Sequence, residues 1–487
     1  MAKHVIFIPP NTNQSSTVDQ QGDTRPDNPR IQQAAILSNP YRLQDVCSAI
    51  REKYIDDIGL AVQATGLGGN RFGPNTSDVV RVTNSIGFSR IREDEAVKEA
   101  DNFDEEGGKL NVALSIPRNN PAFNRPNCLT MRPFTEPMNQ LCSKSLLVRW
   151  LRLLEGRLVA SGQAFRTASG GLFGYEEFTA LTLSLSDANL EQKLGQNPGT
   201  YLAKPSRGTM GQMQKLVQIG GPDEVRRDLL IFLRRSQYRR MRLSHVILQR
   251  YIDPPLLVDK RKFDMRVYYL IVNTRRQSSG VGGRPETGYF AFLHPGFVRL
   301  CSSPYDPSDL KNLALHLTNQ SVQARQSELF SELKEATTWY PDELNAYLNR
   351  RGRLGEMNWA RDVLYPKVAA ILGYVSALYK EHLEDRDFAA GAFRIMGVDM
   401  LVDAKLRVYL LEFNEFPSWG RRTDVLKRVK PNMWLEAVAL AAETSLRFRR
   451  REPINSEADL LAAQNFRLAF SSDAPQLARD RIAQLYP

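Results

Sequence analysis

The sequence predicts a mixed protein of helices and strands, in the α+β class. Residues 201–305 read as strands separated by Gly and Pro. Residues 322–388 carry apolar side chains at helical spacing. Residues 397–414 read as two apolar strands joined by a polar turn, which predicts a hairpin. Strands therefore precede and follow a helical region along the chain.

Length and composition narrow the class of protein. A chain of 487 residues is long for one domain and suggests two or three. Its hydrophobic content of 42% is typical of a globular protein, and no apolar run approaches the roughly 20 residues that a membrane span needs. The four cysteines form no CxxC pair, which favours a reducing compartment such as the cytosol.

The net charge of +11 suits an anionic partner. Arginines gather in runs such as 226–227, 350–353 and 447–451. Nucleic acid, phosphate or an acidic peptide would each suit such runs, and so would a plain solvated surface. Aromatic residues lie only sparsely among the arginines, and no nucleic-acid-binding motif is present. Nucleic acid is therefore the weakest of these partners.

The first quarter of the chain carries no functional signal. Residues 40–65 contain apolar side chains at helical spacing, which predicts a helix. Residues 66–125 are rich in Gly, Asn and Pro.

A second helix is predicted to begin near Ser143, because an apolar stripe of leucines with Trp150 follows it. A later amphipathic helix is predicted over 434–446.

A lysine and a glycine-bearing loop follow the strand predicted at 201–205. The strand leads into Lys204, and the loop after it contains Gly208 and Gly211. A lysine beside such a loop is one way to hold nucleotide phosphates, although the GxxxxGK[ST] loop of P-loop proteins is absent. Lysines before glycine turns are also common where no nucleotide binds, so the pattern by itself is ambiguous.

An apolar strand is predicted at 246–252, and it runs into Asp253, Pro254 and Pro255. A strand that ends at a domain junction offers backbone N–H and C=O groups to the edge of an adenine ring. The same run reads equally well as an ordinary core strand, because its spacing does not distinguish the two cases.

A charged face is predicted on the next strand, 261–272. Alternation places Lys262, Asp264 and Arg266 on one face and apolar side chains on the other. Such a face is either a surface ion-pair ladder or part of a polar cleft. The apolar residues that follow indicate a central strand, which favours the cleft.

A compact polar cluster occupies 315–320 and contains His316, Thr318 and Asn319. A lone histidine in such a position is more often a structural residue than a catalyst. Thr and Asn are also common in turns and helix caps. The cluster alone therefore leaves a structural role and a functional role open.

The predicted hairpin at 397–414 carries three hard oxygen ligands. Glu412 and Asn414 are two apart on one strand and share a face, and the hairpin brings Asp399 near them. Two carboxylates and an amide without His or Cys suit Mg²⁺ that keeps water and phosphate oxygens as its other ligands. The alternative is a hairpin with polar residues on its solvated face.

The order of these patterns resembles the tubulin tyrosine ligase-like family, which belongs to the ATP-grasp superfamily. The resemblance is carried by the strings KFD-x-R, HLTN and LLE-x-N-x-x-P, and it covers roughly residues 200–430. Residues 1–140 show no recognisable match. The resemblance implies an ATP-grasp fold with sheets rich in antiparallel strands. Its ATP cleft would lie between a central part at 141–256 and a C-terminal part at 257–430, followed by a helical tail at 431–487.

The resemblance also implies a role for each matching position. The residues that would hold ATP lie at the phosphates, the adenine-side hinge and the ribose: Lys204, Gly208, Gly211, Gln249, Tyr251, Ile252, Lys262, Asp264, Thr318 and Asn319. The residues that would hold Mg²⁺ are Asp399, Glu412 and Asn414, in agreement with the hairpin pattern. The catalytic set is Arg266 and Arg299, which would face the acceptor carboxylate, together with His316 and Lys427.

The activity implied is ATP-dependent ligation of a free amino acid to a protein carboxylate through an acylphosphate. An acidic acceptor such as a tubulin tail fits the basic chain, and glutamate is the favoured donor because an acidic amino acid suits a basic site. The alternatives are a glycylase or tyrosine ligase of the same family, and an inactive basic adaptor that binds microtubules or nucleic acid. The expected location is the cytoplasm, at the cytoskeleton or cilium. The intact set of Asp399, Glu412 and Asn414 argues against the adaptor, whereas two departures from the family pattern, the loop SRGTMGQM and Phe416, favour it.

Overall fold

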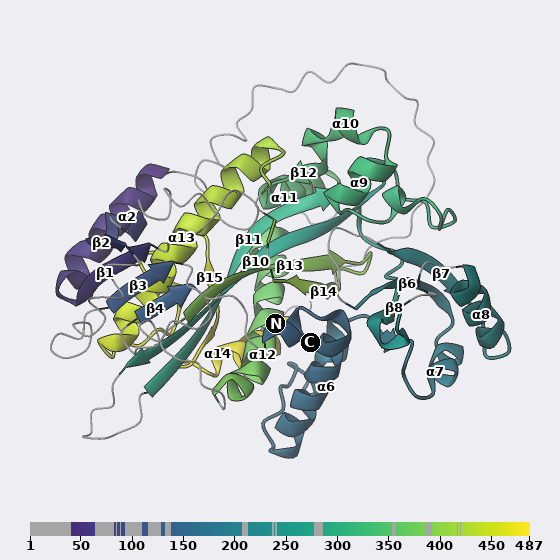
Figure 1. The fold of residues 1–487 in the computed structure, drawn as a ribbon, viewed down its shortest axis with the longest axis horizontal. Helices are drawn as coiled ribbons and strands as arrows, with labels where there is room; N and C mark the ends of the chain where they lie inside the picture. Colours follow the sequence, from purple (N-terminus) through teal and green to yellow (C-terminus); the bar gives the residue numbers. More distant parts are fainter. Residues whose placement is uncertain are drawn as a thin grey trace.

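The computed structural model describes most of the chain from residue 138 onward and parts of the region before it (Figure 1). The described residues are 40–63, 82–83, 85–87, 89–92, 110–114, 128–131, 138–206, 213–235, 238, 241–276, 286–352, 357–384, 392–415, 417–418 and 420–487.

A large mixed sheet forms the centre of the molecule (Figure 1). Among the described residues it contains eleven strands, and its main path runs β12-β11-β10-β13-β4-β3-β1-β2. The pairs from β12 to β13 are antiparallel, and those from β13 to β2 are parallel. The strands are β1 Ile58–Gln63, β2 Ser89–Arg92, β3 Leu110–Leu114, β4 Cys128–Met131, β9 Leu257–Val258, β10 Arg261–Arg276, β11 Glu286–Leu300, β12 Thr338–Trp339, β13 Ala392–Val402, β14 Val408–Asn414 and β15 Arg467–Ser471.

Helices bury both faces of this sheet because β10 is apolar on both faces along most of its length. Met265 and Val267 belong to the same core as α12 (Tyr365–Glu384), and Tyr268 and Leu270 belong to the core that contains the apolar side of α13. α6 and α14 join the first core and α2 joins the second. These helices are α2 Pro40–Tyr54, α6 Lys144–Ala160, α13 Asp424–Arg449 and α14 Leu477–Leu485.

A second, smaller sheet stands apart from the first, on the right of Figure 1. Its order is β5-β8-β6-β7 and all its pairs are antiparallel. Side chains of α7 and α8 pack against it in a separate core. The elements are β5 Thr182–Ser184, α7 Leu190–Gln196, β6 Gly199–Pro205, β7 Lys215–Ile219, α8 Val225–Arg235 and β8 Val246–Arg250.

Most elements expected from the sequence are present. The helix expected in 40–65, the helix after Ser143 and the 397–414 hairpin are confirmed as α2, α6 and β13–β14. The expected helical region contains four α-helices among its described residues: α9 Gln320–Gln326, α10 Phe330–Leu333, α11 Pro341–Arg350 and α12. The mixed α and β class with antiparallel pairing is confirmed as well.

The C-terminal segment differs from the helical tail that was expected at 431–487. α13 already begins at Asp424, so the expected boundary falls inside a helix that covers the large sheet. Farther on, β15 pairs with β11 and makes the segment part of that sheet. A five-residue strand carries too little periodicity to be read with certainty from the sequence. None of the helices in the described ranges is long and apolar enough to cross a membrane.

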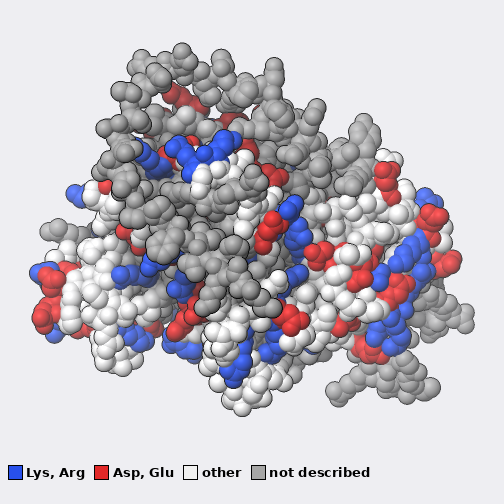
Figure 2. All heavy atoms as spheres, turned by 180° about the vertical axis from the view of Figure 1, so that it is seen from behind, with Lys and Arg blue, Asp and Glu red and all other residues white. Residues whose placement is uncertain are grey.

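Several of the arginine runs are paired with acids. Arg227 lies 2.9 Å from Glu224, and Arg351 lies 3.3 Å from Asp259. On the face shown in Figure 2, Lys and Arg are interleaved with Asp and Glu. Surface pairs of this kind contribute little to stability, but they reduce the field that a basic run presents to a partner. The net charge alone therefore says less about a partner than the charges inside the site do.

One buried acid on α13 leads to a prediction about stability. Glu436 accepts hydrogen bonds from the backbone N–H groups of Asn465 and Phe466, at 2.6 and 2.9 Å. Burial raises its pKa to about 7, although these hydrogen bonds lower it. The folded protein therefore holds a proton that the unfolded chain releases, and stability falls as pH rises from about 4.5 to 7, by at most about 1.4 kcal/mol per pH unit.

Urea denaturation between pH 5 and pH 8 checks this prediction. We expect Glu436→Gln to lose the part of the pH dependence that Glu436 causes. The unfolding free energy of the variant should therefore increase relative to that of the wild type as pH rises. Parallel curves for the two proteins would contradict the assignment.

Candidate functional site

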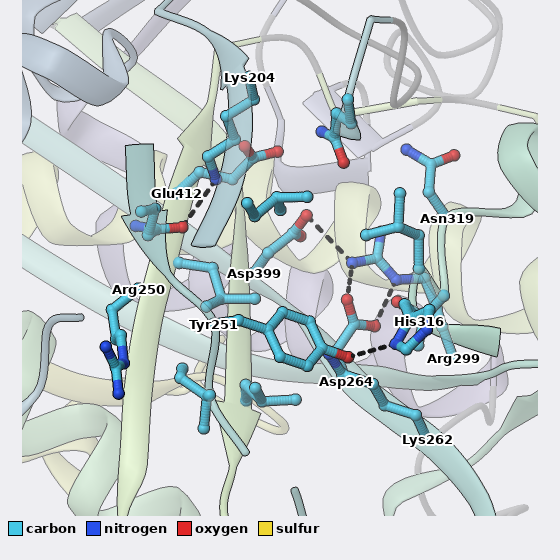
Figure 3. A pocket seen from close by; sticks show the side chains of 18 residues that line it. Lys204, Arg250, Tyr251, Lys262, Asp264, Arg299, His316, Asn319, Asp399 and Glu412 are labelled. Carbon is cyan, nitrogen blue, oxygen red and sulfur yellow. Dashed lines mark hydrogen bonds and ion pairs between the residues drawn. The ribbon is translucent and has the colours of Figure 1, made fainter. Parts of the chain in front are cut away.

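A cavity of about 100 Å³ lies between the two sheets. The small sheet contributes β6 and β8, and the large sheet contributes β10, β11, β13 and β14 (Figure 3). Twelve residues expected at the site line it: Lys204, Gln249, Tyr251, Ile252, Lys262, Asp264, Arg299, His316, Thr318, Asn319, Asp399 and Glu412. The structure thus brings together residues spread over more than 200 positions of the chain.

Six further lining residues were not expected from the sequence: Leu202, Gln214, Arg250, Leu317, Leu401 and Leu411. Four of them are leucines, which give the cavity apolar walls suited to a flat ring. Leu202 lies on β6, and Leu401 and Leu411 lie on the hairpin, two and one positions from expected ligands. Apolar wall residues of this kind look like ordinary strand core in a sequence, so no pattern distinguishes them.

The strand register explains how the charged residues meet. Arg266 on β10 lies directly opposite Asp399 on β13, and Asp399 lies opposite Glu412 on β14. On the other side of β10, Asp264 lies opposite Arg299 on β11. Cross-strand neighbours on one face are close enough for their side chains to interact. The charged face expected on β10 therefore faces the polar cavity and not bulk solvent.

These side chains form a buried ion-pair network (Figure 3). Arg266 donates to both oxygens of Asp399, at 2.5 and 3.1 Å, and Arg299 Nη2 lies 3.0 Å from Asp399 Oδ2. Arg299 also donates to both oxygens of Asp264, at 2.7 and 2.5 Å. Burial alone would raise the pKa of Asp399, but the charges of Arg266 and Arg299 hold it well below its usual value. The carboxylate is therefore ionised at any physiological pH.

Two glycines allow Arg266 to take this position. A Cβ at Gly397 would lie 3.1 Å from Cδ and Nη1 of Arg266, so the bare backbone leaves room for the guanidinium to cross β13. Gly296 has a φ of +63°, and a Cβ there would collide with the carbonyl of Arg266. It lies beside a register shift between β10 and β11, which a glycine in the left-handed region permits.

Glu412 is held by a residue that the sequence analysis missed. Lys144, the first residue of α6, has its Nζ 3.0 Å from Glu412 Oε2, and both side chains are largely buried. Burial would raise the pKa of Glu412, but Lys144 and Lys204 lower it, so this carboxylate is also ionised. The sequence pattern predicted only the apolar stripe of α6. A single lysine at its start, 268 positions before Glu412, carries no signal of its own.

The two expected nucleotide lysines are buried beside polar partners. Lys204 donates to Gln249 Oε1 at 2.8 Å, and Lys262 donates to the Tyr251 hydroxyl at 2.8 Å. Burial lowers the pKa of each lysine to about 8. Both therefore remain mostly charged near neutral pH, and they place positive charge on the wall of the cavity.

A hydrogen-bonded chain continues from Lys262 through Tyr251 to His316. The Tyr251 hydroxyl lies 2.9 Å from His316 Nδ1, and His316 Nε2 lies 3.0 Å from the carbonyl of Asp309. The carbonyl can only accept, so Nε2 carries the proton and Nδ1 accepts from tyrosine. Burial lowers the pKa of His316 and favours this neutral form. The histidine therefore orients Tyr251, while the neighbouring Asn319 caps α9 by accepting from Ser321 N–H at 2.9 Å.

Some expected residues lie elsewhere. Arg266 and Asn414 adjoin the cavity without lining it, and Gly208 and Gly211 lie outside the described residues, as does Phe416. Lys427 is not brought to the site: it is exposed and lies 2.8 Å from Asp424 on the outer side of α13. The buried lysine of this helix is Lys430 instead, because it continues the apolar stripe of α13 that packs on the sheet.

The residues on the hairpin have the chemistry of a Mg²⁺ site. Asp399 and Glu412 are ionised and adjacent, and Asn414 follows Glu412 on the same face. The side-chain nitrogen of Asn414 is buried and has no hydrogen-bond partner within the described part of the chain. No group of three or more His, Cys, Asp or Glu residues that could hold a metal occurs among those same residues. Two carboxylates and an amide oxygen are donors of the kind that suit a hard ion such as Mg²⁺, which keeps several other oxygen ligands.

Comparison with known proteins matches most of the site to a family. The model of the Tubulin-tyrosine ligase family matches residues 210–448, which include every lining residue except Leu202 and Lys204. The chain is 36% identical over 225 residues to "Protein polyglycylase TTLL10" of Macaca fascicularis, covering 45% of this chain and 34% of that protein. It is 35% identical over 225 residues to "Inactive polyglycylase TTLL10" of Homo sapiens, covering 45% and 31%.

A more distant relative carries a different name. The chain is 26% identical over 246 residues to "Tubulin polyglutamylase TTLL6" of Mus musculus, covering 50% of this chain and 26% of that protein. The chain thus spans about a third or less of the length of these relatives. The family resemblance expected from the sequence is confirmed over the region that contains most of the cavity.

Proposed function

We propose that this chain, whose residues 210–448 belong to the tubulin-tyrosine ligase family, is an ATP-dependent ligase that joins an amino acid to a carboxylate of an acidic protein. The observation that carries the proposal is the cavity between the two sheets. Ionised Asp399 and Glu412 lie on one side of it, and buried Lys204 and Lys262 lie on others. Fixed charges of both signs around an apolar-walled cavity suit a metal–nucleotide complex.

Different residues of the cavity would bind the metal ion, the phosphates and the adenine ring. Asp399, Glu412 and Asn414 would hold Mg²⁺, and Lys204 would hold phosphate oxygens as a point charge. The leucine walls and the Tyr251 backbone would take the adenine ring. When bound, Mg²⁺-ATP would supply the phosphoryl group that converts the acceptor carboxylate into an acylphosphate.

The remaining chemistry would involve the two substrates only. The neutral amine of the donor amino acid attacks the acyl carbon, the bond to the phosphate oxygen breaks, and inorganic phosphate and an amide form. The amine releases one proton. No enzyme nucleophile is required for this reaction. Its side chains would hold and orient the substrates and keep water from the acylphosphate.

Glycine and glutamate are the two candidates for the donor amino acid. Relatives with 36% and 35% identity are named as polyglycylases, and the relative with 26% identity is named as a polyglutamylase. We therefore propose glycine as the first donor to test. Glutamate, expected from the basic site, is the second, because cationic groups adjoin the cavity. The tail of tubulin is the acceptor proposed for either, which would bring the protein to the cytoskeleton.

Donor-dependent release of ADP tests the proposal. Purified protein is incubated with Mg²⁺-ATP and a glutamate-rich tubulin-tail peptide, with glycine, glutamate or tyrosine added separately. We expect ADP release that requires both the peptide and one of the amino acids. A rate that is the same with and without peptide and amino acid would contradict ligation.

A second candidate, a catalytically inactive binding protein, is favoured by one observation. A relative with 35% identity is named as inactive. An inactive protein would bind the acidic peptide without releasing ADP in its presence. The same incubation, combined with a measurement of peptide binding, therefore separates the two candidates.

A further inference from the structure

Lys430 is a buried cation without an acidic partner. Its side chain is 4% exposed, and its Nζ donates to the carbonyl of Gly420 at 2.6 Å. Within the described part of the chain, no carboxylate lies within ion-pair distance of it. Burial, together with the charges of Arg266, Arg299, Arg421 and Arg422, lowers its pKa to about 7. The four charged groups named here, which have the largest effects on its pKa, are all positive.

The position of Lys430 follows from the strand register. Its Nζ lies over the ring of Phe297, 5.9 Å from the centroid, and Phe297 is directly opposite Arg266 on the next strand. Lys430 therefore stands on the same face of the large sheet as Arg266, where α13 approaches the charged end of β10. That face continues through Asp399 to Glu412. The lysine thus adjoins the ion-pair network on the side away from β14.

The two neighbouring arginines of the sheet are already neutralised. Arg266 is paired with Asp399, and Arg299 is paired with both Asp264 and Asp399. Two arginines and two carboxylates balance in that network. Lys430 and the exposed Arg421 and Arg422 have no carboxylate partner among the described residues, so the uncompensated positive charge of this region belongs to them.

We propose that Lys430, with the neighbouring Arg421 and Arg422, forms a binding site for a substrate carboxylate. The identity of the ligand rests on the proposed ligase function, which brings two carboxylate-bearing substrates to this region. The carboxylate belongs either to the incoming amino acid or to the acceptor protein. The family resemblance pointed to Arg266 and Arg299 for the acceptor carboxylate, whereas the charge balance assigns a substrate carboxylate to Lys430.

The physical reason is the cost of burying an unpaired charge. An ammonium group taken out of water is destabilised unless an anion or good hydrogen bonds compensate it. A single carbonyl and the face of a phenylalanine compensate Lys430 only in part, and the uncompensated charges of Arg421 and Arg422 oppose it. A bound carboxylate would complete the site, as charge pairs in recognition sites do.

The first test measures binding without relying on activity. Thermal melting is followed for the wild type and for Lys430→Met, in potassium glutamate, potassium acetate and potassium chloride at equal ionic strength. We expect the carboxylate salts to raise Tm of the wild type above its value in chloride, and Lys430→Met to lose that difference. We also expect Lys430→Met to melt at or above the wild-type Tm in chloride, because the unpaired charge is gone. Equal responses of both proteins to the carboxylates would overturn the proposal.

The second test assigns the carboxylate to one substrate. KM is measured separately for the donor amino acid and for the glutamate-rich peptide. Lys430→Met is expected to raise one of these values by at least about 10-fold, and Lys427→Met, three residues away on the same helix, by much less. A rise for the amino acid identifies the donor carboxylate, and a rise for the peptide identifies the acceptor. A larger effect of Lys427→Met than of Lys430→Met on both values would overturn the proposal.

The two tests separate this inference from the proposed function. Absence of ligation in the wild type would refute the ligase function, while the melting comparison would still decide whether Lys430 binds carboxylates. Conversely, normal ligation with an unchanged melting response and unchanged KM values in Lys430→Met would leave the ligase function standing and refute the binding site. The variant Lys430→Arg, which keeps the positive charge, should recover most of the carboxylate response.

Discussion

Replacing Glu412 by Gln is expected to lower the rate of amino-acid ligation by at least about 100-fold, because a metal ion contributes several kcal/mol to stabilising a phosphoryl transition state. Glu412 lies opposite Asp399 in the hairpin and is kept ionised by Lys144 and Lys204. Glutamine keeps the shape of the side chain and an oxygen for Lys144, but it removes the negative charge. The initial rate of incorporation of labelled amino acid checks this expectation.

Glu415→Gln is the matched control for this variant. Glu415 lies three residues farther along the same segment, and its carboxylate pairs with Arg394 at 3.3 Å. We expect it to keep most of the activity, and both variants to show unchanged circular dichroism. If Glu412→Gln ligated amino acids at a rate within threefold of the wild type, the hairpin carboxylates would lose their assigned role.

Removing one partner of the Arg299–Asp264 ion pair should destabilise the protein strongly, because the remaining charge stays buried. Arg299→Leu leaves Asp264 buried without an arginine, and Asp264→Leu leaves Arg299 with Asp399 alone. Because both side chains are 8% exposed, each single change is expected to cost about 3–5 kcal/mol of unfolding free energy. The double variant, which removes both charges, is expected to cost clearly less than the sum of the two.

Chemical denaturation of the four proteins measures this coupling. The double variant is the internal control, since it changes the same volume without leaving a lone charge at Asp264. Strictly additive losses would show that the two side chains act independently and that their short distances carry no coupling energy.

The local parts of the site could be predicted from the sequence. Period-two alternation on β10 predicted that Lys262, Asp264 and Arg266 share a face, and the short polar turn predicted that Asp399 lies near Glu412. Both predictions depend on neighbours in the chain or on a hairpin of short span. Such contacts follow from strand geometry and need no knowledge of the rest of the fold.

Contacts between distant elements could not be predicted in the same way. Lys144 reaches Glu412 only because α6 is docked beside the hairpin, and nothing near Lys144 in the sequence indicates that docking. The choice between Lys427 and Lys430 depends on how α13 is rotated on the sheet. A signal existed here, because Lys430 lies four residues after the buried Leu426 and three before the buried Met433, within the apolar stripe.

The partners of the charged side chains could also be identified only from the structure. The resemblance assigned Arg266 and Arg299 to a substrate carboxylate, and the strand register supplies both of them with carboxylates of the chain itself. Sequence patterns identify which side chains share a face, but the balance of charge on that face depends on which strands become neighbours.

Mass spectrometry of the acceptor is the most direct test of the central claim. A glutamate-rich tubulin-tail peptide is incubated with the protein, Mg²⁺-ATP and one amino acid at a time, and its intact mass is compared with that of a reaction containing Glu412→Gln. The ligase account predicts a mass increase equal to one or more residues of a single amino acid, dependent on ATP and lost in the variant. An unchanged peptide with every donor, although the protein binds both the peptide and Mg²⁺-ATP, would contradict ligation and support a binding protein.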